Sequence, residues 1–231
     1  ADGNIYLGDP SLDPEVALIA ETGFDYVTEN AYIRPTVYIR QIDDFIQGTP
    51  FDDTPGVADS LEEMMASMHG SAAALLRFTN VDARLYGFDL DAGMDLPGRL
   101  RADAVLSYVR GERRDLDEDL YRIAPPSLTA GLTWEGDLWS ATFETRAVAE
   151  QDKVSQTLQE AGTPGHVTLS LYGDWQVKDG VRLSAGVENL LDQITRDHLS
   201  GYNRNAYGDV AIGTRLPGAG RGAFVRLSFV G

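Results

Sequence analysis

The sequence contains no cysteine and only three histidines among its 231 residues. Without cysteine the chain can form neither a disulfide framework nor a thiolate nucleophile or metal ligand. It has no run of 18 apolar residues, which excludes a transmembrane helix. Basic residues are also scarce: 19 Lys and Arg stand against 36 Asp and Glu, for a formal charge of −17. That balance argues against a partner such as nucleic acid, whose phosphates require a basic surface.

Catalytic patterns are absent as well. The three histidines do not have the spacing of a metalloprotease site, and no serine lies at a strand-to-helix nucleophile turn. The glycine-rich stretch 216–222 leads into a predicted strand, so it lacks the helix N-terminus that binds phosphate in phosphate-cradling loops. We therefore predict no catalytic residues and no enzymatic activity.

What the chain does have is a series of long segments with alternating polarity. Most have ten or more residues, which exceeds the usual strand of a soluble fold and matches a tilted membrane strand. In one of them, Val167, Leu169 and Leu171 alternate with Thr168 and Ser170. The nine predicted strands span roughly 15–29, 31–47, 76–95, 100–110, 122–135, 138–150, 166–178, 181–190 and 221–230.

Alternation alone does not decide what the apolar faces contact, because a soluble β-sandwich also alternates, with its apolar face in the core. The connections are more informative, since they alternate in length. Tight turns are expected near 28–30, 97–99, 135–137 and 178–180, whereas 48–75, 111–121, 151–165 and 191–220 are long. Short turns at one end and long loops at the other are typical of an outer-membrane barrel. We predict an all-β fold: an antiparallel, up-and-down transmembrane β-barrel segment of about nine strands, with long external loops and short periplasmic turns.

Several motifs, in order along the chain, resemble the TonB-dependent outer-membrane receptors. The two C-terminal ones are GVENLLDQ at 186–193 and RLPGAGRGAFVRLSF at 215–229. Earlier in the chain stand GDPSLDPE at 8–15, NVDARLYGFDL at 80–90 and the proline pair of IAPP at 123–126. The finer pattern is nearest in appearance to receptors for copper or ferric siderophores. The resemblance places Gly87, Asp89 and Asp91 toward the lumen, and Tyr86, Phe88 and Leu90 toward lipid.

The resemblance implies a function and a set of partners. Receptors of this family have 22 strands and an N-terminal plug that contacts the TonB complex. Residues 1–231 are therefore expected to be the C-terminal portion of such a barrel, with the plug and first strands absent. The expected location is the bacterial outer membrane, where the protein would contact lipid and serve TonB-energised uptake of a metal chelate. A passive outer-membrane porin or barrel-anchored protein is one alternative, and a soluble β-sandwich binding module is another.

Two groups of residues are candidate binding sites. Met64, Met65 and Met68 lie beside His69, and thioether and imidazole groups together suit Cu(I). A short helix over 58–69 would bring these methionines to one face, although the same stripe also suits ordinary loop packing. No bound cofactor is expected beyond a transported metal or chelate. In the last long loop, His198, Tyr202 and Tyr207 form a mixed aromatic and imidazole set that is predicted to face a ligand.

Overall fold

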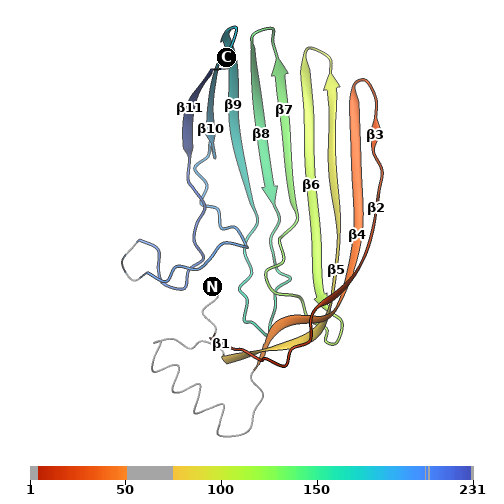
Figure 1. Ribbon diagram of the computed structural model, residues 1–231. Helices are drawn as coiled ribbons and strands as arrows, with labels where there is room; N and C mark the ends of the chain where they lie inside the picture. Colours follow the sequence, from red (N-terminus) through yellow and green to blue (C-terminus); the bar gives the residue numbers. More distant parts are fainter. Residues whose placement is uncertain (1–4, 51–74, 206, 208, 230–231) are drawn as a thin grey trace.

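The computed structural model describes residues 5–50, 75–205, 207 and 209–229. These residues form one sheet whose order is β11-β10-β9-β8-β7-β6-β5-β4-β2, so each strand lies beside its neighbour in the chain (Figure 1). Strand β3 pairs with β4, and β1 pairs in parallel with β5. The strands are β1 (Ile5–Leu7), β2 (Val16–Gly23), β3 (Tyr26–Val27), β4 (Ala31–Pro50), β5 (Leu75–Leu96), β6 (Leu100–Arg113), β7 (Ser127–Glu135), β8 (Trp139–Val148), β9 (His166–Lys178), β10 (Val181–Glu188) and β11 (Gly222–Phe229).

The nine predicted strands are confirmed, with differences at their boundaries. The first predicted strand is divided into β2 and β3, which both pair with β4. Strand β7 begins at Ser127 rather than 122, because Pro125 and Pro126 have no N–H to donate to a ladder. The three-residue strand β1 was not predicted, since its pairing with residues 75–77 is a contact far away in the sequence.

Side chains sort onto two faces, as the alternation predicts. Asp89 opposes Ser107 across β5 and β6, whereas Leu90 opposes Leu106 in the same pair of strands. The side of Asp89 is hereafter the polar face, and the side of Leu90 is the apolar face. The registers of the other strands continue both faces across the sheet.

The apolar face is largely uncovered. Val225 is 76% exposed and Phe229 is 72% exposed, and the described residues form no second sheet against them. A β-sandwich would bury these side chains, whereas a membrane barrel presents them to lipid. Among the described residues, no helix has the length and hydropathy needed to cross a bilayer.

The connections at one end of the sheet are tight turns, and those at the other end are long (Figure 1). Gly98 (φ 83°) and Gly180 (φ 73°) occupy two of the tight turns in the left-handed region, which glycine adopts without steric cost. The length pattern that indicated a barrel is therefore present in the structure.

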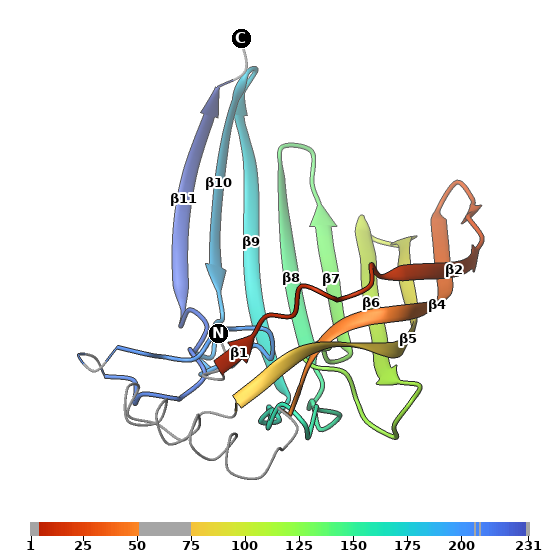
Figure 2. The same ribbon diagram turned by 60° about the horizontal axis from the view of Figure 1, so that its bottom comes forward.

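Strands β4 and β5 extend past the end of β6, whose pairing with β5 stops at Ala83, and their projecting part bends across the loop end of the sheet (Figure 2). At the start of this extension Asp43 and Asp44 of β4 face the single residue Asp82 of β5, which makes a β-bulge. Asp44 has a φ of 60°, which Asp tolerates better than most residues.

A small apolar core lies on the polar face beneath one of the long loops. It joins Ile42 of β4 and Ala83 of β5 to Leu120, which follows β6 and is 1% exposed. Ile123 packs against the same cluster. This core fixes the position of the loop that carries Leu120, and it thereby helps to form the site described next.

Candidate functional site

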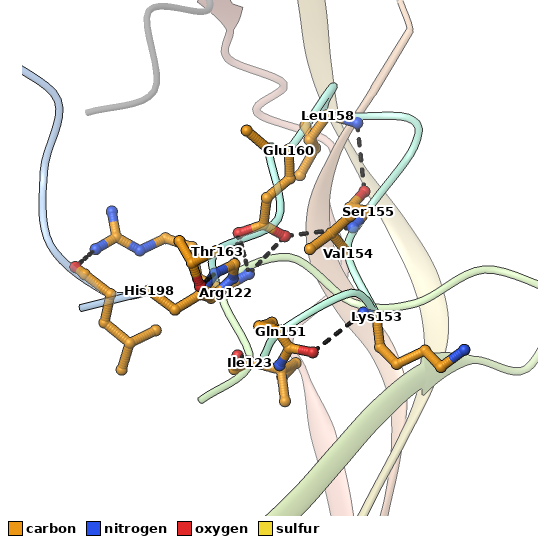
Figure 3. Close-up of polar contacts among 12 residues, drawn as sticks. Arg122, Ile123, Gln151, Lys153, Val154, Ser155, Leu158, Glu160, Thr163 and His198 are labelled. Atoms are coloured by element: carbon orange, nitrogen blue, oxygen red, sulfur yellow. Dashed lines mark hydrogen bonds and ion pairs between the residues drawn. The ribbon is translucent and has the colours of Figure 1, made fainter. Parts of the chain in front are cut away.

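Three long loops come together at the end of the sheet that is opposite the tight turns (Figure 1). They are residues 114–126 between β6 and β7, 149–165 between β8 and β9, and 189–221 between β10 and β11. The middle loop is closed at its base by two backbone hydrogen bonds between Gln151 and Thr163, of 2.9 and 3.1 Å. Gln151 also donates from its side-chain amide to the carbonyl of Ile123 at 2.8 Å, which joins the middle loop to the first (Figure 3).

The first loop contributes the carboxylate of Glu118. The chain returns sharply after β6, where the amide of Arg113 donates to the Glu118 carbonyl at 2.8 Å. This return directs the Glu118 side chain at the middle loop. There it accepts hydrogen bonds from the amide and the hydroxyl of Thr157, both 2.7 Å, and from the hydroxyl of Ser155 at 3.0 Å.

Glu118 is an ionised anchor. Burial alone would raise the pKa of its carboxyl, but the hydrogen bonds from Thr157 and Ser155 and the charge of Arg113 outweigh burial, so the pKa is lowered. Because donors converge on the ionised form, the carboxylate is the form that holds the two loops together.

A second carboxylate, Glu160, lies on the other side of Ser155. The Ser155 amide donates to Glu160 Oε2 at 3.3 Å, and the Arg122 amide donates to the two carboxylate oxygens at 3.1 and 3.2 Å (Figure 3). The Glu160 side chain is only 1% exposed. Glu160 therefore binds the first loop through the backbone of Arg122, while Glu118 binds the middle loop through Ser155.

His198 brings in the third loop. Its side chain is fully buried, with Nδ1 3.1 Å from the Thr163 hydroxyl and Nε2 3.1 Å from Glu160 Oε1. Although Nε2 is this close to the carboxylate, it has no hydrogen-bond partner among the described residues. The predicted ligand residue His198 is thus placed inside the loop assembly, where it joins the last loop to the middle one.

Thr163, His198 and Glu160 have the hydroxyl–imidazole–carboxylate connectivity of a nucleophilic triad. The arrangement nevertheless lacks what such a triad needs. Thr163 is 6% exposed and the imidazole is 0% exposed, so no substrate carbonyl can approach the hydroxyl. The chemistry that this arrangement supports is structural cross-linking of loops.

Arg215 completes the connection of the third loop. Its guanidinium donates to the carbonyls of His198 and Ser200, to the Tyr202 hydroxyl at 2.8 Å, and to the carbonyl of Ala161 at 3.3 Å. It also lies over the Tyr202 ring, 4.7 Å from its centroid. Arg215 therefore links the middle loop to the last and fixes the position of Tyr202.

The structure brings two of the three predicted ligand residues together and leaves the third apart. His198 and Tyr202 share Arg215 as a partner, whereas Tyr207 is 90% exposed and projects from the last loop. Their contact with a ligand stays a prediction, and Tyr207 is the member of the set that is most open to solvent. The other predicted site, Met64, Met65, Met68 and His69, lies outside the described residues. Within the described residues, no group of three or more His, Asp or Glu could hold a metal ion.

Sequence reasoning did not identify Glu118, Ser155, Glu160 or Arg215. Each belongs to a different stretch of a polar loop, and their spacing repeats no motif. The acidic run around 115–119 was visible, but nothing in it shows which carboxylate folds inward. Only the chain return that begins at Arg113 makes that selection.

The polar face below the loops is lined by charged and hydroxyl groups that pair across strands. Tyr32 donates to Asp91 at 3.0 Å, and Arg101 bridges Asp95 and Asp103 at 3.0 and 3.1 Å. Each such exposed pair contributes little to stability. Together they make a hydrophilic wall that suits a water-filled or protein-filled lumen.

A hollow of about 600 Å³ lies elsewhere, on the apolar face. It forms where the small residues Ala141, Gly173 and Ala185 lie in one row across three strands, next to the row of the larger Trp139 and Trp175. Its apolar lining is what a lipid-facing wall presents, so it is not suited to a charged chelate.

The chain matches the family described as "TonB dependent receptor-like, beta-barrel" over residues 1–190. No curated protein sequence matches it. Among solved structures it is similar to the copper transporter OprC, with a TM-score of 0.81, 28% identity, and coverage of 95% of this chain and 32% of that one. The FrpB iron transporter from Neisseria meningitidis (TM-score 0.66, 15% identity, 98% and 32% coverage) shares the fold. So does the siderophore receptor PirA from Acinetobacter baumannii (TM-score 0.65, 16% identity, 97% and 33% coverage).

The chain therefore spans about a third of the length of these structures. The family match covers most of the described strands, and the sheet supplies what that family requires, a polar face, an uncovered apolar face and long loops at one end. The chain belongs to the TonB-dependent receptor family and carries part of its β-barrel.

Proposed function

We propose that this chain is part of a bacterial outer-membrane receptor that takes up a metal ion or metal chelate. The family match over residues 1–190 carries the proposal. In this role the apolar face contacts lipid, the polar face lines the lumen, and the three long loops face the exterior. The protein binds and admits its cargo without making or breaking covalent bonds.

The cargo is proposed from the relatives. Of the three structures named above, the copper transporter has both the higher sequence identity, 28%, and the higher TM-score, 0.81. The iron and siderophore receptors are below 20% identity and support the fold alone. Copper is accordingly the first cargo to test, with a ferric siderophore as the second.

Further barrel strands are part of the proposal. Within the described residues β2 pairs only with β4, and β11 only with β10. An unpaired strand edge cannot face hydrocarbon, because its N–H and C=O groups would lose their hydrogen bonds. We propose that additional strands and a plug complete the barrel, and that the TonB complex acts on that plug. In this arrangement residues 1–231 form the C-terminal portion.

The test is uptake by whole cells. A strain that lacks the gene would be compared with the complemented strain for accumulation of radioactive copper and of ferric siderophores. Each measurement would be repeated in a strain without TonB. We expect uptake to fall when either the receptor gene or TonB is removed, since import against a gradient requires energy from the inner membrane.

Two results would contradict this proposal. Uptake that depends on the gene but not on TonB would indicate a passive porin. Accumulation of both cargos that is unaffected by loss of the gene would remove the proposed role in metal uptake.

A further inference from the structure

One serine contacts both buried carboxylates of the loop assembly. The Ser155 hydroxyl donates to Glu118 at 3.0 Å, and the Ser155 amide donates to Glu160 at 3.3 Å. Ser155 itself is completely buried. It also accepts a hydrogen bond from the Leu158 amide at 3.3 Å, which keeps the turn that carries it closed.

The contacts form a continuous path across three loops. Glu118 belongs to 114–126, Ser155 and Glu160 belong to 149–165, and His198 belongs to 189–221. Among the described residues, the Glu118 side chain has no hydrogen-bond or ion-pair partner in 189–221. Its partners are Arg113, Ser155 and Thr157, which all lie outside that loop. The Glu118 side chain therefore reaches the last loop by way of the middle loop, beside a direct contact between the first and last loops in which the Arg122 guanidinium donates to the Leu199 carbonyl.

We propose that Glu118, Ser155 and Glu160 form a clamp that makes the three loops open and close as one body. The physical basis is the burial of two carboxylates whose donors come from other segments. Lifting one loop away would leave a buried charge without its donors, which is more costly than breaking a solvated contact. The loops are therefore held in a single arrangement in which none moves alone.

A consequence follows for the receptor. In a set of independent loops, a cargo that touches one loop orders that loop only. With the clamp in place, contact at the exposed last loop is transmitted to 114–126, more than sixty residues earlier in the chain. The clamp can be tested without any cargo, so its failure is distinguishable from failure of the proposed transport function.

The experiment is amide hydrogen exchange on the complete receptor purified from outer membranes. The reporters are the amides of Asn203 and Leu216, which donate within the last loop to Thr214 and Gly201, each at 2.8 Å. The test variants are Ser155→Ala, which removes the link between the carboxylates, and Glu118→Gln, which keeps the shape but removes the charge. We expect exchange at both reporters to accelerate roughly tenfold in each variant, as for the loss of one hydrogen bond to a charged group.

Thr157→Val is the matched control. It deletes one hydrogen bond to Glu118, like Ser155→Ala, but leaves the path from Glu118 through Ser155 to Glu160 intact. We expect faster exchange near 155–158 and little change at the reporters. The amides of β8 should exchange as in the unmodified protein, which shows that each variant is folded.

Independent loops would give a different pattern. Both test variants would then accelerate exchange in 114–126 and 149–165 while Asn203 and Leu216 kept their original rates. That pattern in Glu118→Gln alone would overturn the proposal, even if Ser155→Ala failed to fold.

Discussion

The ring of Tyr38 on β4 lies against Gly87 on β5, in the space that a side chain at position 87 would occupy. The two residues are direct partners in the antiparallel register, and both belong to the polar face. A methyl group at position 87 would overlap the phenol and also meet the Tyr108 carbonyl. The tyrosine can lie flat on the sheet only because its partner is glycine.

We therefore predict that Gly87→Ala destabilises the barrel by about 1–3 kcal/mol, the usual cost of overpacking. The measurement is the temperature at which the detergent-solubilised receptor loses its folded mobility in gel electrophoresis. Gly131→Ala is the control, because this glycine is also on the polar face but its Cβ would meet only Thr142, at 3.9 Å. Equal transition temperatures for both variants would show that the close packing of Tyr38 on Gly87 does not contribute to the stability of the barrel.

The lowered pKa of Glu118 predicts that the loops weaken in acid. A carboxyl whose pKa is lower in the folded state contributes its full stability above its unfolded pKa, about 4.5, and loses it as the pH falls further. Protease cleavage within 114–126 and 149–165 should therefore increase below about pH 4.5. Glu118→Gln should cleave readily at all pH values, whereas Glu150→Gln, an exposed residue of the same loop region, should behave like the unmodified protein.

His198 and Tyr207 should respond differently to replacement by alanine. His198→Ala removes a fully buried imidazole and leaves the Thr163 hydroxyl without its Nδ1 partner, so we expect it to cost about 1–3 kcal/mol in loop stability. Tyr207→Ala removes a 90% exposed ring and should change stability by no more than about 0.5 kcal/mol.

Measurements of cargo binding would distinguish a residue that contacts the cargo from one that only keeps the loops ordered. If Tyr207 contacts the cargo, its alanine variant should bind more weakly while its thermal transition is unchanged. The His198→Ala variant should lose affinity only together with loop order, as measured by proteolysis. Unaltered cargo affinity in Tyr207→Ala would contradict the predicted ligand role of that tyrosine.

The methionine prediction can be tested by copper titration of the complete receptor. Because thioethers suit Cu(I), Met64→Ala combined with Met68→Ala should weaken Cu(I) binding by at least about tenfold if these residues are ligands. Met94→Ala is the control, since the fourth methionine lies on β5, 48% exposed. Identical copper affinity in the double variant and the control would leave these methionines as packing residues.

The strands were predictable because their signal is local. Alternation with a period of two places Asp89 and Leu90 on opposite faces whatever their neighbours are. Strand ends were less predictable, as at Ser127, where the proline pair decides the boundary. β1 could not be predicted, because three residues carry no usable periodicity and their pairing partner lies seventy residues away.

The loop assembly was not predictable for a related reason. His198 was recognised as a candidate because it shares the last long loop with two tyrosines, but its burial depends on Glu160 and Thr163 from another loop. Glutamates in acidic runs are normally solvated, so Glu118 gave no sign of its inward position. Contacts between loops depend on the length of each strand and on where the chain turns, and the sequence of a loop does not determine either.

The bulge at Asp43 and Asp44 changes which residues of β4 face each side, and this matters for chemical labelling. Before it, even-numbered residues such as Tyr38 point to the lumen side; after it, Gln47 and Thr49 are the inward residues, paired with Thr79 and Arg77. A labelling scan that continued the even-numbered rule past the bulge would choose Ile46, which is paired with Asn80 and lies on the opposite face. The absence of cysteine turns this into an advantage, because within this chain each introduced thiol is the sole reactive one. Thiol probes at positions 46 and 49, beyond the bulge, would then report the two faces of this strand.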